Sequence, residues 1–309
     1  MTAPVALFVF NRPDHLRRTI ESLRACNGFE DTLVTVFADG PRDATDEAAV
    51  RETRAIATSM LPGAEFRFAE QNRGLANSII GGVEHLLGRH GRVIVVEDDL
   101  ILDPGFLRWM NAALDHFEDD VRVYQVSGHM FDVPNLTGRH QALLLPLTTT
   151  WGWATWARAW RAFDADAQGW YALRSDAALR RRFNVDGAYD YAQMLEKQME
   201  GRRQSWGIRW YWSVFRRSGL CCFPPRSLVD NTGMDGSGTH GRGRFRRFGV
   251  DVSTPVRARV PLVFAAPTPA VIDQAAWAAV ARAIWTQNGG HVGRVLDSIR
   301  RLRDRLVSP

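Results

Sequence analysis

Cysteine is scarce in this chain, and two of its three cysteines, Cys221 and Cys222, are adjacent. Three thiols arranged in this way provide neither a disulfide framework nor a CxxC metal site. No basic leader precedes the first apolar stretch, residues 5–10, which is too short for a signal core or a membrane span. We therefore expect a cytoplasmic protein with reduced thiols and no membrane span.

Two common nucleotide-binding folds lack their motif at the position where they need it. The sequence contains no G-x-x-x-x-G-K-[ST] loop, whose backbone amides and lysine hold phosphates in P-loop NTPases. No G-x-G-x-x-G turn follows the first apolar stretch, so a dinucleotide-binding fold would lack its phosphate turn. We therefore exclude P-loop NTPases and do not expect a dinucleotide cofactor.

Charge of one sign is only slightly in excess. The 309 residues include 39 Lys and Arg and 34 Asp and Glu, which gives a formal net charge of +5. This balance favours anionic partners such as nucleotides or acidic lipids. No readout helix or aromatic sheet motif accompanies the basic segments, so we do not expect nucleic-acid binding.

The first part of the chain alternates short apolar runs with helical stretches. The runs span residues 5–10, 32–39, 65–70, 93–97 and 121–127. Strands that are apolar throughout and separated by helices are typical of βαβ units, whose parallel sheet is covered on both faces. The sequence therefore predicts an α/β fold with a mostly parallel sheet flanked by helices.

The pattern changes after residue 127. Eight of the eleven tryptophans lie between residues 151 and 212, and no repeat or linker marks a boundary. We predict one domain over residues 1–266, whose halves are 1–127 and 128–266, followed by a C-terminal helical extension over 267–309.

The end of this extension has the pattern of a basic amphipathic helix. In residues 294–306, apolar side chains fall on one helix face and arginines lie mostly elsewhere. Such a helix can lie on an anionic membrane surface. We therefore expect peripheral contact with the inner face of the membrane.

Polar residues follow the apolar runs, where the strands are expected to end. In a parallel sheet, ligands bind beyond the carboxyl ends of the strands, which share one edge. The residues at these ends are Asn11, Arg12, Asp39, Asn72, Arg73, Glu97, Asp98 and Asp99. We expect them to form one rim.

Glu97, Asp98 and Asp99 directly follow four buried-type residues, 93–96. Uncompensated carboxylates are costly in a dry site, so a positive partner is expected there. Carboxylates in a row suit Mg²⁺ or Mn²⁺, which bind through one or two carboxylates while phosphates and waters complete the shell. The alternative is that one acid caps the next helix and the others are solvated.

Other residues have a functional and a structural interpretation. Arg12, before Pro13, suits phosphate oxygens at a helix start, although it could be a surface arginine. Asp39 could accept hydrogen bonds from ribose, although its Asp-Gly-Pro turn needs no ligand. The indoles of TTTWGWATWARAW offer flat faces for sugars or bases, and we favour Trp153 for contact; a buried structural cluster is the alternative.

The order of these segments resembles the GT-A glycosyltransferases, especially bacterial enzymes related to the eukaryotic N-acetylglucosaminyltransferase I. The resemblance rests on Asn-Arg-Pro, Ala-Asp-Gly, Asn-Arg-Gly-Leu-Ala-Asn, EDD, GWATW and SLVDNTGMDGSGTH, within residues 3–245. It implies transfer of a hexose or N-acetylhexosamine from a nucleotide-diphosphate sugar with Mn²⁺ or Mg²⁺. The acceptor would be a saccharide or lipid-linked saccharide, as in polysaccharide biosynthesis. Residues 1–127 would be the nucleotide-sugar-binding half and 128–266 the acceptor-side half.

The resemblance implies roles for the acids and for one histidine. Asp99 would be the direct metal ligand, Asp98 would reach the ribose, and Glu97 would contact the donor sugar. His240, in the glycine-rich loop 233–243, would approach the metal or the phosphates.

It also implies a set of donor-binding residues on the same rim. Arg12 would bind the diphosphate, and Asn11 would join the donor site beside it. Asp39 and the Asn72 to Arg73 segment would border the nucleoside.

One departure from the family concerns the catalytic base. In N-acetylglucosaminyltransferase I an acidic pair follows a tryptophan, but the aligned Trp206 is followed by Gly207 and Ile208. An inverting transfer needs a group that takes the proton of the acceptor hydroxyl. We favour Asp190, on the helix expected in DGAYDYAQMLEKQ, with a solvated helix acid as the alternative. If the missing pair indicates a retaining enzyme, the expectation of inversion fails as well.

Two other classes stay open at this point. A nucleotide-sugar-binding protein without transferase activity would keep the donor site and release no product. A metal-dependent nucleotidyltransferase would cleave between phosphates and release a nucleoside monophosphate instead of a diphosphate.

Overall fold

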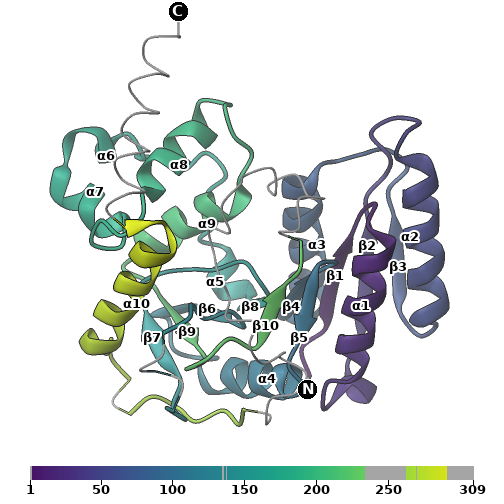
Figure 1. The fold of residues 1–309 in the computed structure, drawn as a ribbon, viewed down its shortest axis with the longest axis horizontal. Helices are drawn as coiled ribbons and strands as arrows, with labels where there is room; N and C mark the ends of the chain where they lie inside the picture. The colour runs from purple at the N-terminus through teal and green to yellow at the C-terminus, as the bar shows by residue number, and fades with distance from the viewer. Residues whose placement is uncertain (1, 134–135, 137, 234–261, 269, 291–309) are drawn as a thin grey trace, which may run out of the picture.

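The computed structural model describes residues 2–133, 136, 138–233, 262–268 and 270–290. Through this part of the chain runs an eight-stranded sheet in the order β3-β2-β1-β4-β8-β6-β9-β7 (Figure 1). Its strands are β1 (Val5–Val9), β2 (Val34–Ala38), β3 (Glu65–Phe68), β4 (Arg92–Glu97), β6 (Val123–Ser127), β7 (Leu143–Leu145), β8 (Trp153–Trp156) and β9 (Leu220–Phe223). A two-stranded sheet pairs β5 (Leu100–Leu102) antiparallel with β10 (Val229–Asn231).

Strand directions bring several carboxyl ends to one edge. β3, β2, β1 and β4 are parallel to one another. β8 is antiparallel to both β4 and β6, and β9 is parallel to β6. Because two reversals restore the direction, β6 and β9 end at the same edge as β1, β2 and β4. The predicted α/β class, with a mostly parallel sheet flanked by helices, is confirmed.

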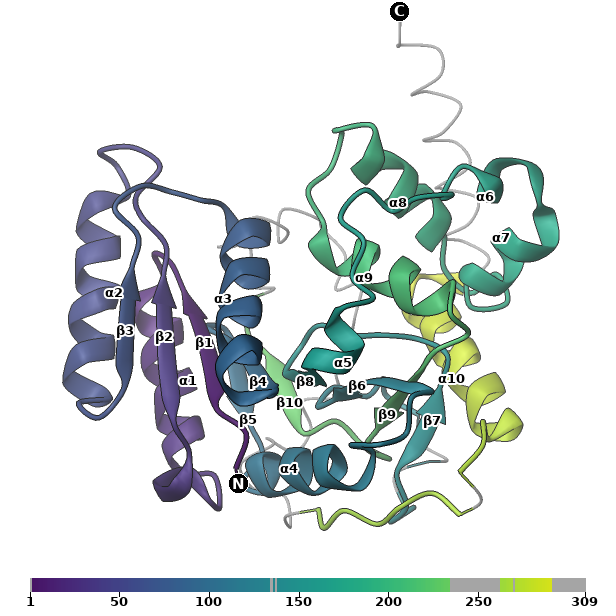
Figure 2. The same ribbon diagram turned by 180° about the vertical axis from the view of Figure 1, so that it is seen from behind.

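Helices cover both faces of the sheet (Figure 2). One face carries α1 (Pro13–Arg24), α2 (Glu47–Met60) and α4 (Phe106–His116). The other carries α3 (Leu75–His90), the short α5 (Ala157–Trp160) and α9 (Trp206–Phe215). The remaining elements are the 3₁₀ turn η1 (Phe29–Asp31), α6 (Ala172–Ser175), α7 (Ala177–Phe183), α8 (Tyr191–Met199) and α10 (Gln274–Gln287).

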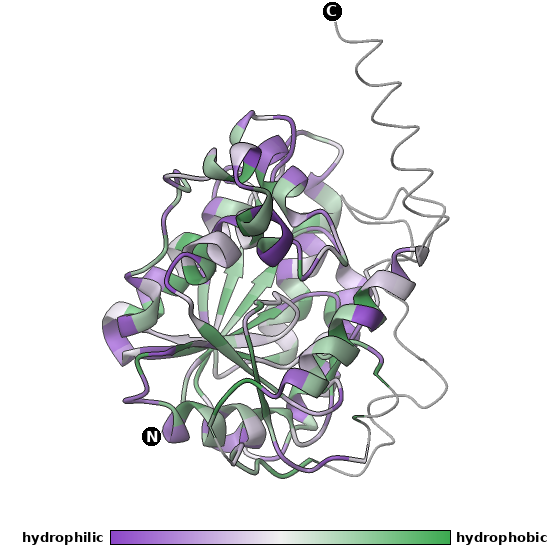
Figure 3. Cartoon of the chain, turned by 90° about the vertical axis from the view of Figure 1, so that its left-hand side faces the viewer, coloured by the Kyte–Doolittle hydropathy of each residue, from purple (hydrophilic) through white to green (hydrophobic). Residues whose placement is uncertain are grey.

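β1 shows why these strands are apolar throughout. Val5, Leu7 and Val9 belong to the core under α1, α2 and α4. Ala6 and Phe8 belong to the core under α3. Successive side chains of a strand point to opposite faces, and both faces are covered here, so neither set can be polar. Figure 3 shows the resulting hydrophobic strands in the interior of the molecule.

The second half has a further core. Ala276, Val280 and Ile284 of α10 are buried in it together with residues of α8, α9, β7 and β9. The first helix of the predicted C-terminal extension therefore packs onto the 128–266 half. Residues 294–306, the predicted amphipathic helix, lie outside the described residues. Among the helices that the structure describes, none is long and apolar enough to cross a membrane.

Candidate functional site

The predicted rim residues of β1 and β4 are neighbours in the structure. The two strands are in parallel register, and Phe8 pairs with Glu97. The chain beyond each strand therefore emerges at the same place, with Asn11 and Arg12 after β1 and with Asp98 and Asp99 after β4.

Arg12 and Asp99 form an ion pair at this junction. Nη1 of Arg12 lies 3.0 Å from Oδ2 of Asp99, and the side chains are 17% and 18% exposed. The pair joins the cap of α1 to the turn after β4. The predicted positive partner of the acids is thus Arg12.

Thr232 and Gly233 cover the Asp99 side of this pair. The backbone N and Oγ1 of Thr232 donate hydrogen bonds of 2.8 and 3.0 Å to the carbonyl oxygen of Asp99. A Cβ on Gly233 would lie only 2.0 Å from Oδ2 of Asp99 and 2.8 Å from Nη1 of Arg12, so any side chain there is excluded. Both residues belong to the SLVDNTGMDGSGTH segment, and Gly233 begins the glycine-rich loop 233–243, but their contact with Asp99 was not predicted. The available signal was the sequence Asn231-Thr232-Gly233, which begins at the last residue of β10.

Asp98 ties β4 to β1. Its Oδ2 accepts a hydrogen bond of 3.1 Å from the backbone N of Phe10, and its carbonyl oxygen accepts one of 2.8 Å from Oγ1 of Thr19. The side chain is buried, and burial together with the charge of Asp99 raises the pKa of Asp98 to about 7.

The other two acids are also short of compensating charge. Burial, followed by the charges of Asp99 and Asp98, raises the pKa of Glu97 well above its usual value. Burial raises the pKa of Asp99 as well, although Arg12 opposes the shift. Three adjacent carboxylates beside one guanidinium therefore form a site that gains from a further cation.

The donor set fits Mn²⁺ or Mg²⁺. Both ions take hard oxygen ligands and need only one or two protein carboxylates when a phosphate group completes the shell. Asp99 and Asp98 offer such oxygens in a poorly compensated, buried setting. Among the described residues, no group of three or more His, Cys, Asp or Glu side chains is arranged as a ready metal cage. His240, the other predicted ligand, lies outside the described residues.

Asp39 builds the next part of the rim. Its Oδ1 accepts hydrogen bonds from the backbone N of Gly40 (2.9 Å) and of Arg73 (2.8 Å), and its Oδ2 accepts one from Gly74 (2.9 Å). Asn72 donates from Nδ2 to the carbonyl oxygen of Gly40 at 2.9 Å. Both side chains hold the 71–74 loop against the end of β2, while the Arg73 side chain is exposed. Their predicted contact with a nucleoside stays a prediction.

Asn11 is held by residues that the sequence reasoning missed. Its Nδ2 donates to Oδ1 of Asp46 at 2.8 Å, and Nε of Arg42 donates to Oδ2 of Asp46 at 2.6 Å. The hydrogen bond from Arg42 is the main reason why the pKa of Asp46 falls to about 2. The Arg42 guanidinium also lies over the ring of Phe10, 5.2 Å from its centre. The i,i+4 spacing of Arg42 and Asp46 was the available signal.

The expectation that Trp153 contacts the donor is corrected by its burial. Trp153 has no exposed surface, and its ring centre lies 5.3 Å from that of Trp206 and 5.8 Å from that of Trp160. It pairs with Val95 in the middle of the sheet. The structural alternative, a buried indole cluster, therefore describes Trp153.

Trp151 lies just before β8, at the end of that strand that lies toward the acids. The first residue of β8, Trp153, pairs with Val95, two residues before Glu97. Trp151 is partly exposed and packs edge-on against His129, with ring centres 4.6 Å apart. Burial lowers the pKa of His129 to about 3, so this ring is neutral at physiological pH.

Asp190 lies in the helical layer of the second half. It is the N-cap of α8, where its Oδ1 accepts hydrogen bonds from the backbone N of Gln193 (3.1 Å), Nη2 of Arg180 (3.0 Å) and Nδ2 of Asn184 (3.0 Å). Figure 2 shows α8 beside α6, α7 and α9, while β1 and β2 lie on the other side of the molecule. These three partners of Asp190 belong to the helical layer and not to the rim.

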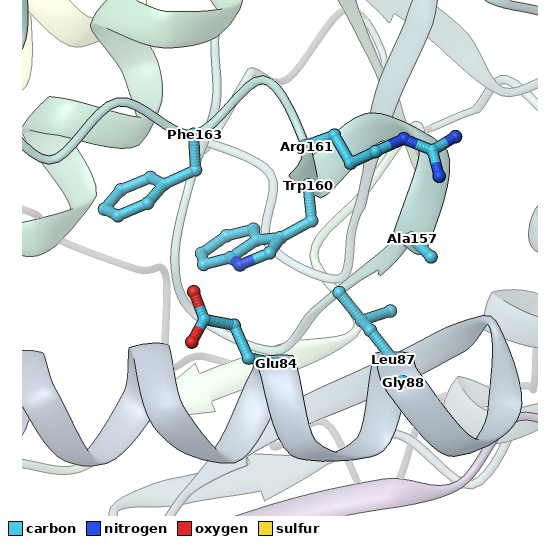
Figure 4. Close-up of a pocket in the computed structure, with 7 residues that line it drawn as sticks. All are labelled: Glu84, Leu87, Gly88, Ala157, Trp160, Arg161 and Phe163. Atoms are coloured by element: carbon cyan, nitrogen blue, oxygen red, sulfur yellow. The ribbon is translucent and has the colours of Figure 1, made fainter.

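A surface hollow of about 410 Å³ lies elsewhere, between α3 and α5 (Figure 4). Glu84, Trp160 and Phe163 line it. α5 follows Trp156, which pairs with Arg92 at the start of β4, so the hollow is at the opposite end of that strand from the acids. It is not part of the candidate site.

Solved structures of three glycosyltransferases resemble parts of the chain. A structure of GalNAc-T7 with UDP, GalNAc and Mn²⁺ is 9% identical, with a TM-score of 0.48 over 74% of this chain and 44% of that one. The mannosyltransferase PcManGT from Pyrobaculum calidifontis, in complex with GDP-Man and Mn²⁺, is 13% identical, with a TM-score of 0.37 over 71% and 74%. Glucosyl-3-phosphoglycerate synthase from Mycobacterium tuberculosis, in complex with Mn²⁺, UDP and phosphoglyceric acid, is 14% identical, with a TM-score of 0.34 over 52% and 58%. The chain spans less than half the length of the GalNAc-T7 chain.

The parallel strands that end in a rim of acids and arginine, with a reversed strand beside them, define an α/β fold of the GT-A glycosyltransferase class. The profile of glycosyl transferase family 2 matches residues 5–177, which is more than half of the chain. The chain belongs to glycosyl transferase family 2. The match includes Arg12, Asp39 and the three acids. The particular relation to N-acetylglucosaminyltransferase I is not confirmed.

Proposed function

We propose that this protein transfers a hexose or N-acetylhexosamine, with inversion, from a nucleotide-diphosphate sugar to a hydroxyl of a saccharide or lipid-linked saccharide. The observation that carries the proposal is the 3.0 Å pair of Arg12 and Asp99 on a rim where Asp98 is buried and Glu97 is half-buried beside it. Family membership supports glycosyl transfer, and the excess of buried carboxylates supports a divalent cation and a diphosphate as partners.

Each rim residue has a task in this proposal. The guanidinium of Arg12 binds the diphosphate, because its fork of donors matches phosphate oxygens. Asp99 is the direct ligand of Mn²⁺ or Mg²⁺, and such an ion, when bound, neutralises charge that grows on the departing diphosphate. Asp98 reaches the ribose, and Glu97 contacts the transferred sugar.

The acceptor side of the proposal rests on fewer contacts. Trp151 offers a partly exposed indole at the end of β8 that lies toward the acids, of the kind that packs against sugars. Asp190 remains the proposed general base, because Trp206 is followed by Gly207 and Ile208 instead of acids. Contact with an anionic membrane through residues 291–309 is also part of the proposal.

The decisive experiment measures the nucleotide product. Wild-type protein incubated with UDP- and GDP-sugars and Mn²⁺ should release nucleoside diphosphate, separated by anion-exchange chromatography. Asp99→Ala, or EDTA with the wild type, should lower the rate at least about 100-fold, because charge on the leaving group is no longer neutralised. Asp43→Ala, an exposed acid outside the rim, is the control and should keep the wild-type rate.

Other outcomes would contradict the proposal in recognisable ways. Donor binding without any product indicates a binding protein, and release of a nucleoside monophosphate indicates a nucleotidyltransferase. Full activity of Asp99→Ala and of the EDTA-treated wild type would remove the metal.

A further inference from the structure

We infer that Arg12 has two partners in turn: Asp99 while the donor is absent, and the donor diphosphate once it arrives. In this scheme the donor draws the guanidinium of Arg12 away from Asp99, the proposed metal ligand. Arg12 is therefore a positioning residue that couples binding of the metal to binding of the donor. The inference rests on the proposed function, because it takes the diphosphate donor and the metal from it.

The first observation is that Arg12 occupies one of the two carboxylate oxygens of Asp99, the proposed metal ligand. Its Nη1 lies 3.0 Å from Oδ2 of Asp99, and Asp99 is the one side-chain partner of Arg12 among the described residues. With both side chains less than one-fifth exposed, solvent screens the pair only in part.

The second observation is that Oδ2 is crowded by Gly233 as well as by Arg12. Gly233 packs so closely that even a methyl group on it would lie 2.0 Å from Oδ2 of Asp99. Thr232 fixes the position of this segment through two hydrogen bonds to the carbonyl oxygen of Asp99. A metal bonds a carboxylate oxygen at roughly 2.0–2.2 Å, so it can reach Oδ2 only after the guanidinium has moved.

The third step is electrostatic. Arg12 and a divalent cation repel each other at this distance, and each stabilises Asp99 in the absence of the other. A diphosphate attracts both, and it offers the guanidinium a second set of oxygens. By linkage, a donor that moves Arg12 raises the affinity for metal, and the metal raises the affinity for donor by the same factor.

The test is the affinity of the nucleotide-free protein for Mn²⁺ alone, measured from the electron paramagnetic resonance signal of unbound Mn²⁺. Arg12→Gln removes the competing charge and should tighten Mn²⁺ binding about tenfold, within the usual range of coupling between two sites. Arg12→Lys keeps a positive charge and should bind Mn²⁺ like the wild type. Arg73→Gln removes an exposed arginine of the same rim as the matched control, and Asp99→Asn should abolish binding in every background.

A gain of affinity is a readout that loss of structure cannot produce. Equal or weaker Mn²⁺ binding by Arg12→Gln would overturn the inference, and so would equal tightening in Arg73→Gln or undiminished binding in Asp99→Asn. The measurement uses no sugar donor. A protein that shows this Mn²⁺ pattern but transfers no sugar would therefore overturn the proposed function and leave the role of Arg12 intact.

Discussion

The fold disfavours the ionised form of Asp98. Its carboxylate accepts a hydrogen bond from the backbone of Phe10, but burial and the charge of Asp99 still raise its pKa to about 7. At physiological pH, the ionised form of Asp98 therefore destabilises the folded protein. A cation on the rim would offset this effect.

This predicts a pH-dependent difference between the wild type and Asp98→Asn. Between the ordinary aspartate pKa of about 4 and the folded value of about 7, the folded state binds more protons than the unfolded state, so the stability contributed by Asp98 falls as pH rises. In EDTA at pH 8, Asp98→Asn should therefore exceed the wild type in free energy of unfolding, by up to about 4 kcal/mol. The gain should be smaller at pH 5.

Urea unfolding followed by circular dichroism measures both values. Asp120→Asn is a suitable control, because the pKa of Asp120 is lowered by its hydrogen bond with Arg122, so its charge stabilises the fold. Two results would show that the charge of Asp98 does not destabilise the folded protein. One is an equal gain in the free energy of unfolding of Asp98→Asn at pH 5 and at pH 8, and the other is no gain at pH 8.

At the level of single residues, sequence reasoning placed charges better than it assigned their partners. Arg12 and Asp99 were expected on one rim because both follow strands of a parallel sheet. That Asp39 would use both oxygens on the 71–74 loop could not be predicted, because its partners are backbone groups more than thirty residues away. The hydrogen bonds of Thr232 to the carbonyl oxygen of Asp99 could not be predicted for the same reason.

At the level of elements, the position of Asp190 at the N-cap of α8 determines which substitution can test its role. Asparagine caps a helix about as well as aspartate, so Asp190→Asn keeps the cap and removes the base. If Asp190 is the general base, the Asp190→Asn variant should transfer sugar at least about 100-fold more slowly than the wild type, with donor affinity nearly unchanged. Asp190→Ala should in addition lose about 1 kcal/mol of stability through the missing cap.

Initial rates at saturating donor, together with thermal unfolding of both variants, measure these effects. Asp176→Asn at the N-cap of α7 is a matched control on a neighbouring helix, and its rate should not change. A wild-type rate in Asp190→Asn would show that Asp190 has a structural role, through the cap of α8 and its contacts with Arg180 and Asn184, and is not the general base.

At the level of the whole molecule, the two halves share one core. Trp153, Trp206 and Trp210 lie in the same buried cluster as Val93 and Val95 of β4. Such a cluster cannot open in one half without exposing apolar surface in the other. The predicted halves are therefore expected to unfold together.

Two probes check this expectation. Tryptophan fluorescence reports mainly on residues 151–212, where most indoles lie, and far-ultraviolet circular dichroism reports on all helices. In urea the two curves should coincide in one transition. Two separated transitions would show that the halves are independent domains.

The fold class was predictable because short apolar runs alternate with helical stretches along the chain, as they do in a parallel sheet covered by helices on both faces. The strand order was not, because β8 enters the sheet between β4 and β6 through tertiary contacts that leave no local pattern. The role of Trp153 was mistaken for a related reason. The indole spacing in TTTWGWATW predicts a strand face, but not which indole faces the core.

The reversed direction of β8 has one more effect. A strand parallel to β4 would reach this edge with its last residue, after crossing the whole sheet. β8 instead starts at this edge, so Thr150, Trp151 and Gly152, which directly precede β8, lie there. Residues that follow β4 and residues that precede β8 therefore lie at the same edge of the sheet, although the chain runs through the two strands in opposite directions.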